Sequence, residues 1–245
     1  MLALLTDFGD SEYLGQMKAV IYAINPFTQL VDLSNSVKPQ NIREGAWMLS
    51  TSFELFPKHT VFLCVVDPGV GGKRKAIAIQ TKNYFFVGPN NGLMWPAAQK
   101  DGVKAVRILN VKNASKTFHG RDVFARAAAL LESGVRFKKL GTASQKKKLE
   151  KLKFFFDAKK RIGEVVKTDH FGNIITNLPH RNEKKYLVEL HDFKKKLPFY
   201  ETYEKAEPEE LFLVEGSAST LEISKKGDSA AKTLKVRVGE HIIIK

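Results

Sequence analysis

The chain has 245 residues, of which 43% are hydrophobic and 27% are charged, so it has the length and composition of a globular protein with a complete core. No uninterrupted apolar run approaches the roughly 18 residues that cross a bilayer, which argues against a membrane span. The opening MLALLTDFGD lacks the basic lead of a signal peptide, and the single cysteine, Cys64, lies in an apolar run. We therefore expect a cytoplasmic protein without a disulfide.

The formal net charge of +14 raises the possibility of nucleic-acid binding. The segment 146–161 alone holds eight Lys or Arg residues against two acids, Glu150 and Asp157. Such a run is typical of a solvated basic connector, and no zinc-finger or RNA-recognition motif accompanies it. The charge distribution therefore disfavours a nucleic-acid partner.

Residues 1–145 alternate between short apolar runs and segments with helical spacing. This alternation predicts a three-layer α/β domain with a mostly parallel sheet. The expected strands are 2–5, 29–33, 61–66, 76–81, 84–87 and 103–109, and the expected helices are 13–24, 40–56 and 123–133.

The stretch VFLCVVDPGVGGKRKAIAI at 61–79 places Asp67 and Arg74 close together after a strand that reads as buried on both faces. Open α/β sheets bind ligands at the carboxyl ends of their strands. The loop glycines permit tight turns and a close approach to a ligand. A structural turn in which Asp67 and Arg74 only pair with each other is the alternative. His119 precedes a further expected helix and is a candidate acid or base, although a structural role is also compatible with its position.

The pattern changes after the basic connector at 146–161. Five short apolar runs with little helical periodicity predict a β-rich C-terminal domain over 162–245, with strands at 162–168, 185–190, 211–215, 220–224 and 234–244. This domain begins near Asp169-His170-Phe171-Gly172-Asn173, a polar cluster that fits either an Asx-type turn or a second set of ligand contacts.

Three separated groups of motifs resemble one family. They are TDFGDSEYLGQMKAVI at 6–21; VVDPGVGGKR at 65–74 with PNNGL at 89–93 and FHGRDVFA at 118–125; and DHFGNIITNL at 169–178. Together they resemble the S-adenosyl-L-methionine (SAM) hydroxide adenosyltransferases, in the superfamily that includes fluorinases and chlorinases. The resemblance implies a β-barrel-like C-terminal domain and a homotrimer with active sites between subunits. It implies SAM as the substrate and no cofactor or metal.

The same resemblance implies a catalytic set of Asp67, Arg74 and His119. Halogenases resemble this chain but carry Tyr and Thr at the positions of Asp67 and Val70, Ser at that of Gly120, and an insertion between Ala76 and Tyr84. A carboxylate at position 67 would also repel a halide. We therefore expect water to be the nucleophile, with Asp67 orienting it, Arg74 keeping Asp67 ionised and His119 completing the hydrogen-bond network. The residue that finally accepts the proton stays open.

Substrate contacts follow from the resemblance position by position. Asp7 matches a contact to the ribose hydroxyls, and Tyr13 and Phe118 match positions near the sugar and the methionine. Asp169 matches a contact to the methionine ammonium and Asn173 one to the adenine edge, with Phe171 and Tyr203 as aromatic walls. The match of Ser217, Lys225 and Gly227 is weaker, because EGSASTLEIS stands at 215–224 where relatives have an Asn-Ser-x-Gly type turn. Asn35 and Asn41 replace a His and an Asp of many relatives.

Two other functions compete with SAM hydrolysis. The first is SAM-dependent halogenation. The second is a metal-dependent phosphoesterase, because carboxylates at strand ends often hold divalent cations. Its candidate ligands are Asp7, Asp10, Asp67, His119, Asp122 and His170. A phosphate-binding P-loop is excluded because its G-x-x-x-x-G-K-[ST] pattern requires Gly at the position of Asp67 and Ser or Thr at that of Arg74. A non-catalytic adenosine- or SAM-binding protein is a further alternative.

Overall fold

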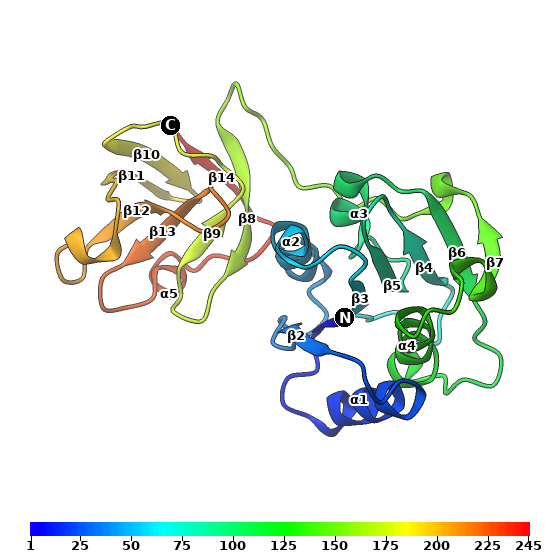
Figure 1. Cartoon of the computed structure of the whole chain (residues 1–245). Coiled ribbons are helices and arrows are strands. Elements are labelled where there is room, and N and C mark those ends of the chain that lie inside the picture. The colour runs from blue at the N-terminus through cyan, green and yellow to red at the C-terminus, as the bar shows by residue number, and fades with distance from the viewer. The chain divides into compact units, whose positions relative to one another are not determined.

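The computed structural model describes residues 1–245, which form two compact units, Met1–Leu152 and Lys153–Lys245 (Figure 1). The division falls inside the segment 146–161. Within that segment Leu149 is buried and Lys146–Lys148 forms a single 3₁₀ turn. None of the helices combines the length and apolar character needed to span a membrane.

The N-terminal unit is built on a seven-stranded mixed sheet. Its first four strands are parallel neighbours, and the other three join them in antiparallel pairings. The strand order is β2 (Leu30–Ser34), β1 (Leu2–Thr6), β3 (Val61–Val65), β5 (Phe85–Pro89), β4 (Ala76–Gln80), β6 (Ala105–Leu109) and β7 (Gly141–Ser144). Every residue of β1 and β3 is buried, as expected for central strands covered on both faces.

Helices cover both faces of this sheet and make it the middle of three layers (Figure 1). The helices α1 (Glu12–Ile24) and α4 (Arg126–Glu132) pack with Leu2, Leu4 and Leu63 on one face. Opposite them lie α2 (Ile42–Ser52) and α3 (Trp95–Asp101). The order of the sheet brings the carboxyl ends of β1 and β3 side by side, so Asp7 and Asp67 follow adjacent strands.

The C-terminal unit is a seven-stranded antiparallel sheet that nearly closes into a barrel. The strand order is β11 (Phe193–Pro198), β10 (Lys185–Leu190), β14 (His241–Ile244), β8 (Ile162–Thr168), β9 (Ile174–Thr176), β13 (Leu221–Lys225) and β12 (Leu211–Glu215). Phe199, just after β11, forms an isolated bridge to Leu213 of β12 and so links the two edges. Closure removes unpaired strand edges. The predicted α/β class with a barrel-like second domain is confirmed.

Several sequence-based boundaries were wrong for local reasons. The segment 234–244 was expected to be one strand, but α5 (Ala230–Leu234) ends there and β14 covers only His241–Ile244. The helix α3 was missed because seven residues are too few for a periodic pattern, and β11 was missed because FKKKLP does not alternate clearly. The expected helix 123–133 begins as a π-helical turn, η2 (Gly120–Ala125), before α4.

Candidate active site

Asp67 and Arg74 form a two-pronged ion pair at the carboxyl end of β3. Arg74 Nε donates to Asp67 Oδ1 at 2.9 Å, and Arg74 Nη2 donates to Asp67 Oδ2. The side chain of Arg74 is only 10% exposed and that of Asp67 only 6%, so solvent screens this pair weakly. Arg74 also lies over the ring of Phe124, 5.3 Å from its centre. The planar guanidinium therefore has a single well-defined orientation.

His119 joins the same hydrogen-bonded set. Its Nδ1 lies 2.8 Å from Arg74 Nη2, and the arginine nitrogen can only donate, so Nδ1 is the acceptor. The proton of the neutral imidazole is consequently on Nε2. Burial lowers the pKa of His119, and the positive charge of Arg74 lowers it further, against the opposing effect of Asp67 and Asp122. This neutral tautomer presents Nε2–H as a hydrogen-bond donor.

A close contact between two loops brings these three residues together. Gly71 has a φ of +73°, and a Cβ at this position would lie 2.2 Å from the main-chain oxygen of Lys116. Only glycine allows the loop after β3 to approach the loop before His119 so closely. His119 then leads into the π-helical turn η2, a type of distortion that is frequent at functional sites.

The three side chains lie beside a cavity of about 710 Å³ within the N-terminal unit, of which Asp67 and His119 form part of the wall. Asp7, Tyr13 and Phe118 also line it. Asp7 Oδ2 accepts a hydrogen bond of 2.8 Å from the main-chain N–H of Gln40. Its other oxygen has no hydrogen-bond partner within the protein. The structure thus gathers Asp7, Tyr13, Asp67, Phe118 and His119 on the wall of one cavity, and Arg74 contacts two of them, Asp67 and His119.

Three aromatic rings stand together on this cavity wall. The ring of Phe118 lies 5.2 Å from Tyr13 and 5.9 Å from Phe8, in edge-to-face contacts. Tyr13 remains 48% exposed. Such a cluster offers an apolar surface beside the charged set. Phe8 was not named from the sequence, although it lies next to Asp7.

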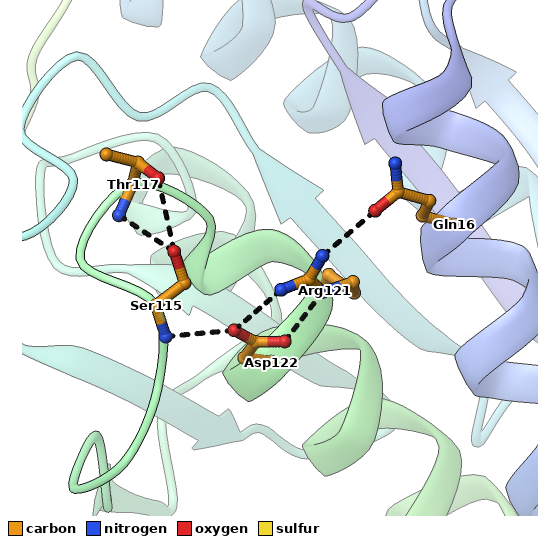
Figure 2. A network of polar contacts seen from close by, with 5 residues as sticks. All are labelled: Gln16, Ser115, Thr117, Arg121 and Asp122. Carbon is orange, nitrogen blue, oxygen red and sulfur yellow. Dashed lines mark hydrogen bonds and ion pairs between the residues drawn. The ribbon is translucent and has the colours of Figure 1, made fainter.

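A polar network beside the cavity was also missed from the sequence (Figure 2). Arg121 Nη1 donates to Gln16 Oε1 at 3.0 Å, and Arg121 Nε donates to Asp122 Oδ1 at 2.7 Å. Asp122 Oδ2 accepts from the main-chain N–H of Ser115 at 2.9 Å, and Ser115 Oγ lies 3.1 Å from Thr117 Oγ1. The network ties α1 to the loop that carries Phe118 and His119. The Arg-Asp pair directly after His119-Gly120 was the available signal.

Arg121 also supports an aromatic wall of the cavity. Its guanidinium carbon lies 5.1 Å from the centre of the Phe118 ring, within the range of a cation–π contact. The same guanidinium donates through Nη2 to Asp122 Oδ2 at 3.1 Å. Arg121 itself lines the cavity, whereas Asp122 lies outside its wall and contacts Arg121 and the main chain of Ser115.

The C-terminal residues named from the sequence line a second cavity, of about 700 Å³, within the C-terminal unit. Asp169, Phe171, Asn173 and Tyr203 all contribute to its wall, together with Lys225 and Gly227. Ser217 does not line this cavity and lies in the exposed turn between β12 and β13. The structure thus groups the C-terminal candidates except Ser217.

The DHFGN turn is held by its own aspartate. Asp169 Oδ1 accepts from the main-chain N–H groups of Phe171 at 3.0 Å and Asn173 at 2.8 Å, and Oδ2 accepts from Asn173 Nδ2 at 2.8 Å. The turn is an Asx-type turn, as one sequence interpretation held, and it also lines a cavity. Gly172 packs so tightly on Ser229, at the start of α5, that a Cβ would lie 2.1 Å from Ser229 Oγ.

Tyr203 is paired with a buried acid that the sequence did not single out. Its hydroxyl donates to Glu222 Oε2 at 3.0 Å. Burial, followed by the charge of Glu222, raises the pKa of Tyr203 to about 12. Burial also raises the pKa of Glu222, with a further contribution from Asp169. Glu222 is 7% exposed and therefore bears an electrostatic cost when it is ionised.

The Glu222→Gln variant tests this cost through the pH dependence of stability. A raised carboxyl pKa means that the folded state binds more protons than the unfolded state above pH 4.5. The contribution of Glu222 to the free energy of unfolding therefore falls as pH rises from 4.5 through the pKa of the folded state. The variant lacks this loss. The quantity to compare is the free energy of unfolding of the variant minus that of the unchanged protein. We expect this difference to be higher at about pH 8 than at about pH 5, as measured by urea unfolding. Glu215→Gln, an exposed change at the end of β12, should show no such trend.

The residues proposed for a metal-dependent phosphoesterase do not form a metal-binding cluster. No group of three or more His, Cys, Asp or Glu side chains in the chain is arranged to hold a metal ion. Asp67 and Arg74 instead neutralise each other, which disfavours a cation beside them. The geometry thus gives no support to that alternative.

The structure is that of a two-domain α/β protein with a cavity lined by predicted site residues in each domain. Comparison with known proteins identifies its family. Residues 2–141 match the SAM hydroxide adenosyltransferase N-terminal domain, and residues 163–243 match the C-terminal domain of the same family. The (R)-S-adenosyl-L-methionine hydrolase of Methanocaldococcus jannaschii is 35% identical over 273 residues, covering 100% of this chain and 95% of that protein. The chain belongs to the SAM hydroxide adenosyltransferase family, as its motifs indicated.

A solved structure and a more distant enzyme complete the comparison. The crystal structure of an uncharacterised conserved protein from Thermotoga maritima matches with a TM-score of 0.92 and 36% identity over 100% of both chains. A fluorinase from Actinoplanes sp. (strain N902-109) is 24% identical and covers 75% of this chain and 72% of its own. The hydrolase is therefore more similar to this chain than the fluorinase, in identity and in coverage.

Proposed function

We propose that this protein hydrolyses S-adenosyl-L-methionine to adenosine and L-methionine by attack of water at ribose C5′. The observation that carries the proposal is the hydrogen-bonded set of Asp67, Arg74 and His119 beside one cavity, in a chain of this family. Methionine leaves as a neutral thioether from a sulfonium, so the leaving group needs no proton. The protein has to position the water and remove its proton.

The geometry supports separate roles for the three residues. Asp67 is a carboxylate that lines the cavity and is the candidate to orient the water and accept its proton. Arg74 holds Asp67 in place with two hydrogen bonds. His119 accepts from Arg74 and donates through Nε2–H, which suits the oxygen of the attacking water. A donor role for His119 leaves Asp67 as the stronger candidate base.

Further parts of the proposal extend to the substrate and the assembly. Asp7 would bind the ribose hydroxyls, with Tyr13 and Phe118 beside the sugar and the methionine. Asp169, Phe171, Asn173, Tyr203 and Ser217 would contribute contacts from the C-terminal unit. We also propose a homotrimer with active sites between subunits and no cofactor, as the resemblance implies, and a cytoplasmic location, as expected from the sequence. Light scattering of the purified protein tests the trimer.

Product analysis tests the reaction directly. The purified protein is incubated with SAM, with and without chloride or fluoride, and the products are identified by mass. Adenosine and methionine support hydrolysis, and a 5′-halogenated adenosine supports the halogenase alternative. Absence of SAM consumption would contradict both. Equal rates with and without EDTA are expected, because no step assigned to Asp67, Arg74 or His119 calls for a metal.

The Asp122→Asn variant tests the network of Figure 2. The loss of a charged acceptor for Arg121 and for Ser115 N–H should lower the free energy of unfolding by about 1–2 kcal/mol. A less ordered Phe118 wall should raise KM for SAM several-fold, with a smaller change in kcat. Steady-state kinetics and urea unfolding measure both effects. An unchanged KM would remove the network from substrate binding, and Asp192→Asn, in an exposed turn, is the matched control.

A further inference from the structure

A separate cavity of about 340 Å³ in the C-terminal unit is strongly cationic. Its wall contains five basic side chains and one acid, Glu183; the basic residues are Arg161, Arg181, Lys185, Lys196 and Lys245. It shares no lining residue with the cavity of Asp169 and Tyr203. The residues assigned to SAM hydrolysis therefore do not account for this concentration of positive charge.

Arg161 carries a positive charge that the protein leaves uncompensated. The residue is only 4% exposed. Its Nε donates to the carbonyl of Ile244 at 2.9 Å and its Nη2 to the carbonyl of Pro179 at 3.0 Å, while Nη1 is enclosed and has no partner. Burial lowers the pKa of Arg161, and the charge of Arg181 lowers it further. A buried charge with only neutral partners is costly, and an unsatisfied buried donor calls for an explanation such as a bound ion.

The other cations around this cavity are also poorly neutralised. Lys185 and Lys196 lie on the paired strands β10 and β11, where Leu187 faces Lys196. Arg181 Nη2 donates to the carbonyl of Ala158 at 3.2 Å. The one carboxylate pairing among the five is between Lys245 Nζ and Glu189 Oε1, at 3.9 Å. An anion in the cavity would thus face several charges that have no competing partner.

We propose that this cavity binds a small phosphate-bearing anion. A phosphate group carries about −1.5 to −2 charges near pH 7 and offers three strong acceptor oxygens, so it offsets more of the excess charge than one carboxylate does. Arginine side chains suit phosphate geometry. The volume is at the lower end of the range of small-molecule sites, roughly 300–1,000 Å³. The phosphate could belong to a soluble ester or to a phospholipid headgroup.

Direct binding measurements test the proposal independently of catalysis. Glycerol 3-phosphate and inorganic phosphate are titrated calorimetrically at an ionic strength held constant with chloride. In a second arm, the protein is sedimented with vesicles of phosphatidic acid or of phosphatidylcholine alone. The test variant is Lys185→Gln/Lys196→Gln, which leaves Arg161 and its structural hydrogen bonds in place. The matched control is Lys184→Gln/Lys195→Gln, which removes equal charge one position away on or beside the same strands and outside the cavity wall.

Saturable binding with one phosphate per chain is the expected result. The test variant should raise Kd by at least about ten-fold, and the control variant by less than about two-fold. Binding to phosphatidic acid vesicles alone, with the same dependence on the variants, would assign the phosphate to a lipid. Absence of saturable binding in both arms would overturn the proposal. Equal weakening by the two variants would also overturn it, because it would indicate diffuse surface charge. Unchanged SAM turnover in the test variant is expected throughout.

Discussion

The Asp67→Asn variant is expected to turn over SAM at least about a hundred-fold more slowly than the unchanged protein. Asparagine cannot accept the proton of the attacking water. Its amide also replaces one carboxylate oxygen by a donor, which would face a donating nitrogen of Arg74. The measurement is kcat for adenosine formation at saturating SAM. Near-normal turnover would remove Asp67 from the mechanism.

The same substitution leaves Arg74 without its counter-charge in a largely buried position. Breaking such a pair costs about 3–5 kcal/mol when it is fully buried, so a thermal melt must show that the variant is folded at the assay temperature. Asp10→Asn is the matched control. Asp10 lies in the same turn as Asp7, is exposed and does not line the cavity. Its turnover of SAM should be unchanged.

The Arg74→Lys variant is expected to lose about ten- to a hundred-fold in turnover although the charge is kept. Lysine has a single flexible ammonium and cannot reproduce the planar fork that holds Asp67 and also reaches His119 Nδ1. His119 would then lose the donor that fixes its tautomer. The measurement combines kcat with the proton NMR signals of His119. Arg126→Lys, an exposed change on α4, should leave both unchanged.

Arg74 also contributes to the acidic limit of activity. The neutral form of His119 is the one that accepts from Arg74, and burial together with the charge of Arg74 lowers the pKa of His119 below its ordinary value of 6.5. Activity that depends on neutral His119 should therefore persist below pH 6.5 and fall as pH drops through the lowered pKa. The stability contribution has the same sign, because the unfolded state takes up the proton at higher pH than the folded state. Arg74→Lys keeps the repelling charge and should preserve this limit even as turnover falls.

Local sequence patterns were sufficient for the α/β class and for Asp67, Arg74 and His119 as candidates, whereas the barrel-like second domain and the contacts of Asp7, Tyr13 and Phe118 came from the resemblance. The apolar runs of β1 and β3 predicted buried central strands, and Asp7 and Asp67 follow those strands directly. The turn at Asp169 was also predictable from the sequence, because Asp and Asn favour side-chain hydrogen bonds to nearby main-chain N–H groups. The joint action of Asp67, Arg74 and His119, in contrast, came from resemblance and not from spacing.

Features that depend on contacts between distant segments were not predictable from spacing. Glu222 was recognised only from its contact with Tyr203 and the nearby charge of Asp169. The excess positive charge around Arg161 was recognised only because the fold places Arg181 and the lysines of two strands on the same cavity wall. Ser217 was expected among the C-terminal contacts from the resemblance; the turn between β12 and β13 that holds it does not line the cavity of Asp169 and Tyr203, and its contact to the substrate stays a prediction. Each of these outcomes depends on how strands pair, which residue types alone do not specify.

The DPGVGGKR loop shows which properties of the site are local and which depend on the tertiary structure. By itself the sequence determined a strand end, a flexible glycine turn and a carboxylate with an arginine seven residues away, because these are local properties of residue type and order. Only the tertiary structure showed where His119, 45 residues beyond Arg74, lies: its Nδ1 accepts from Arg74 and its side chain forms part of the cavity wall. The physical reason is that the close packing of Gly71 on Lys116, which joins the two loops, is a long-range contact.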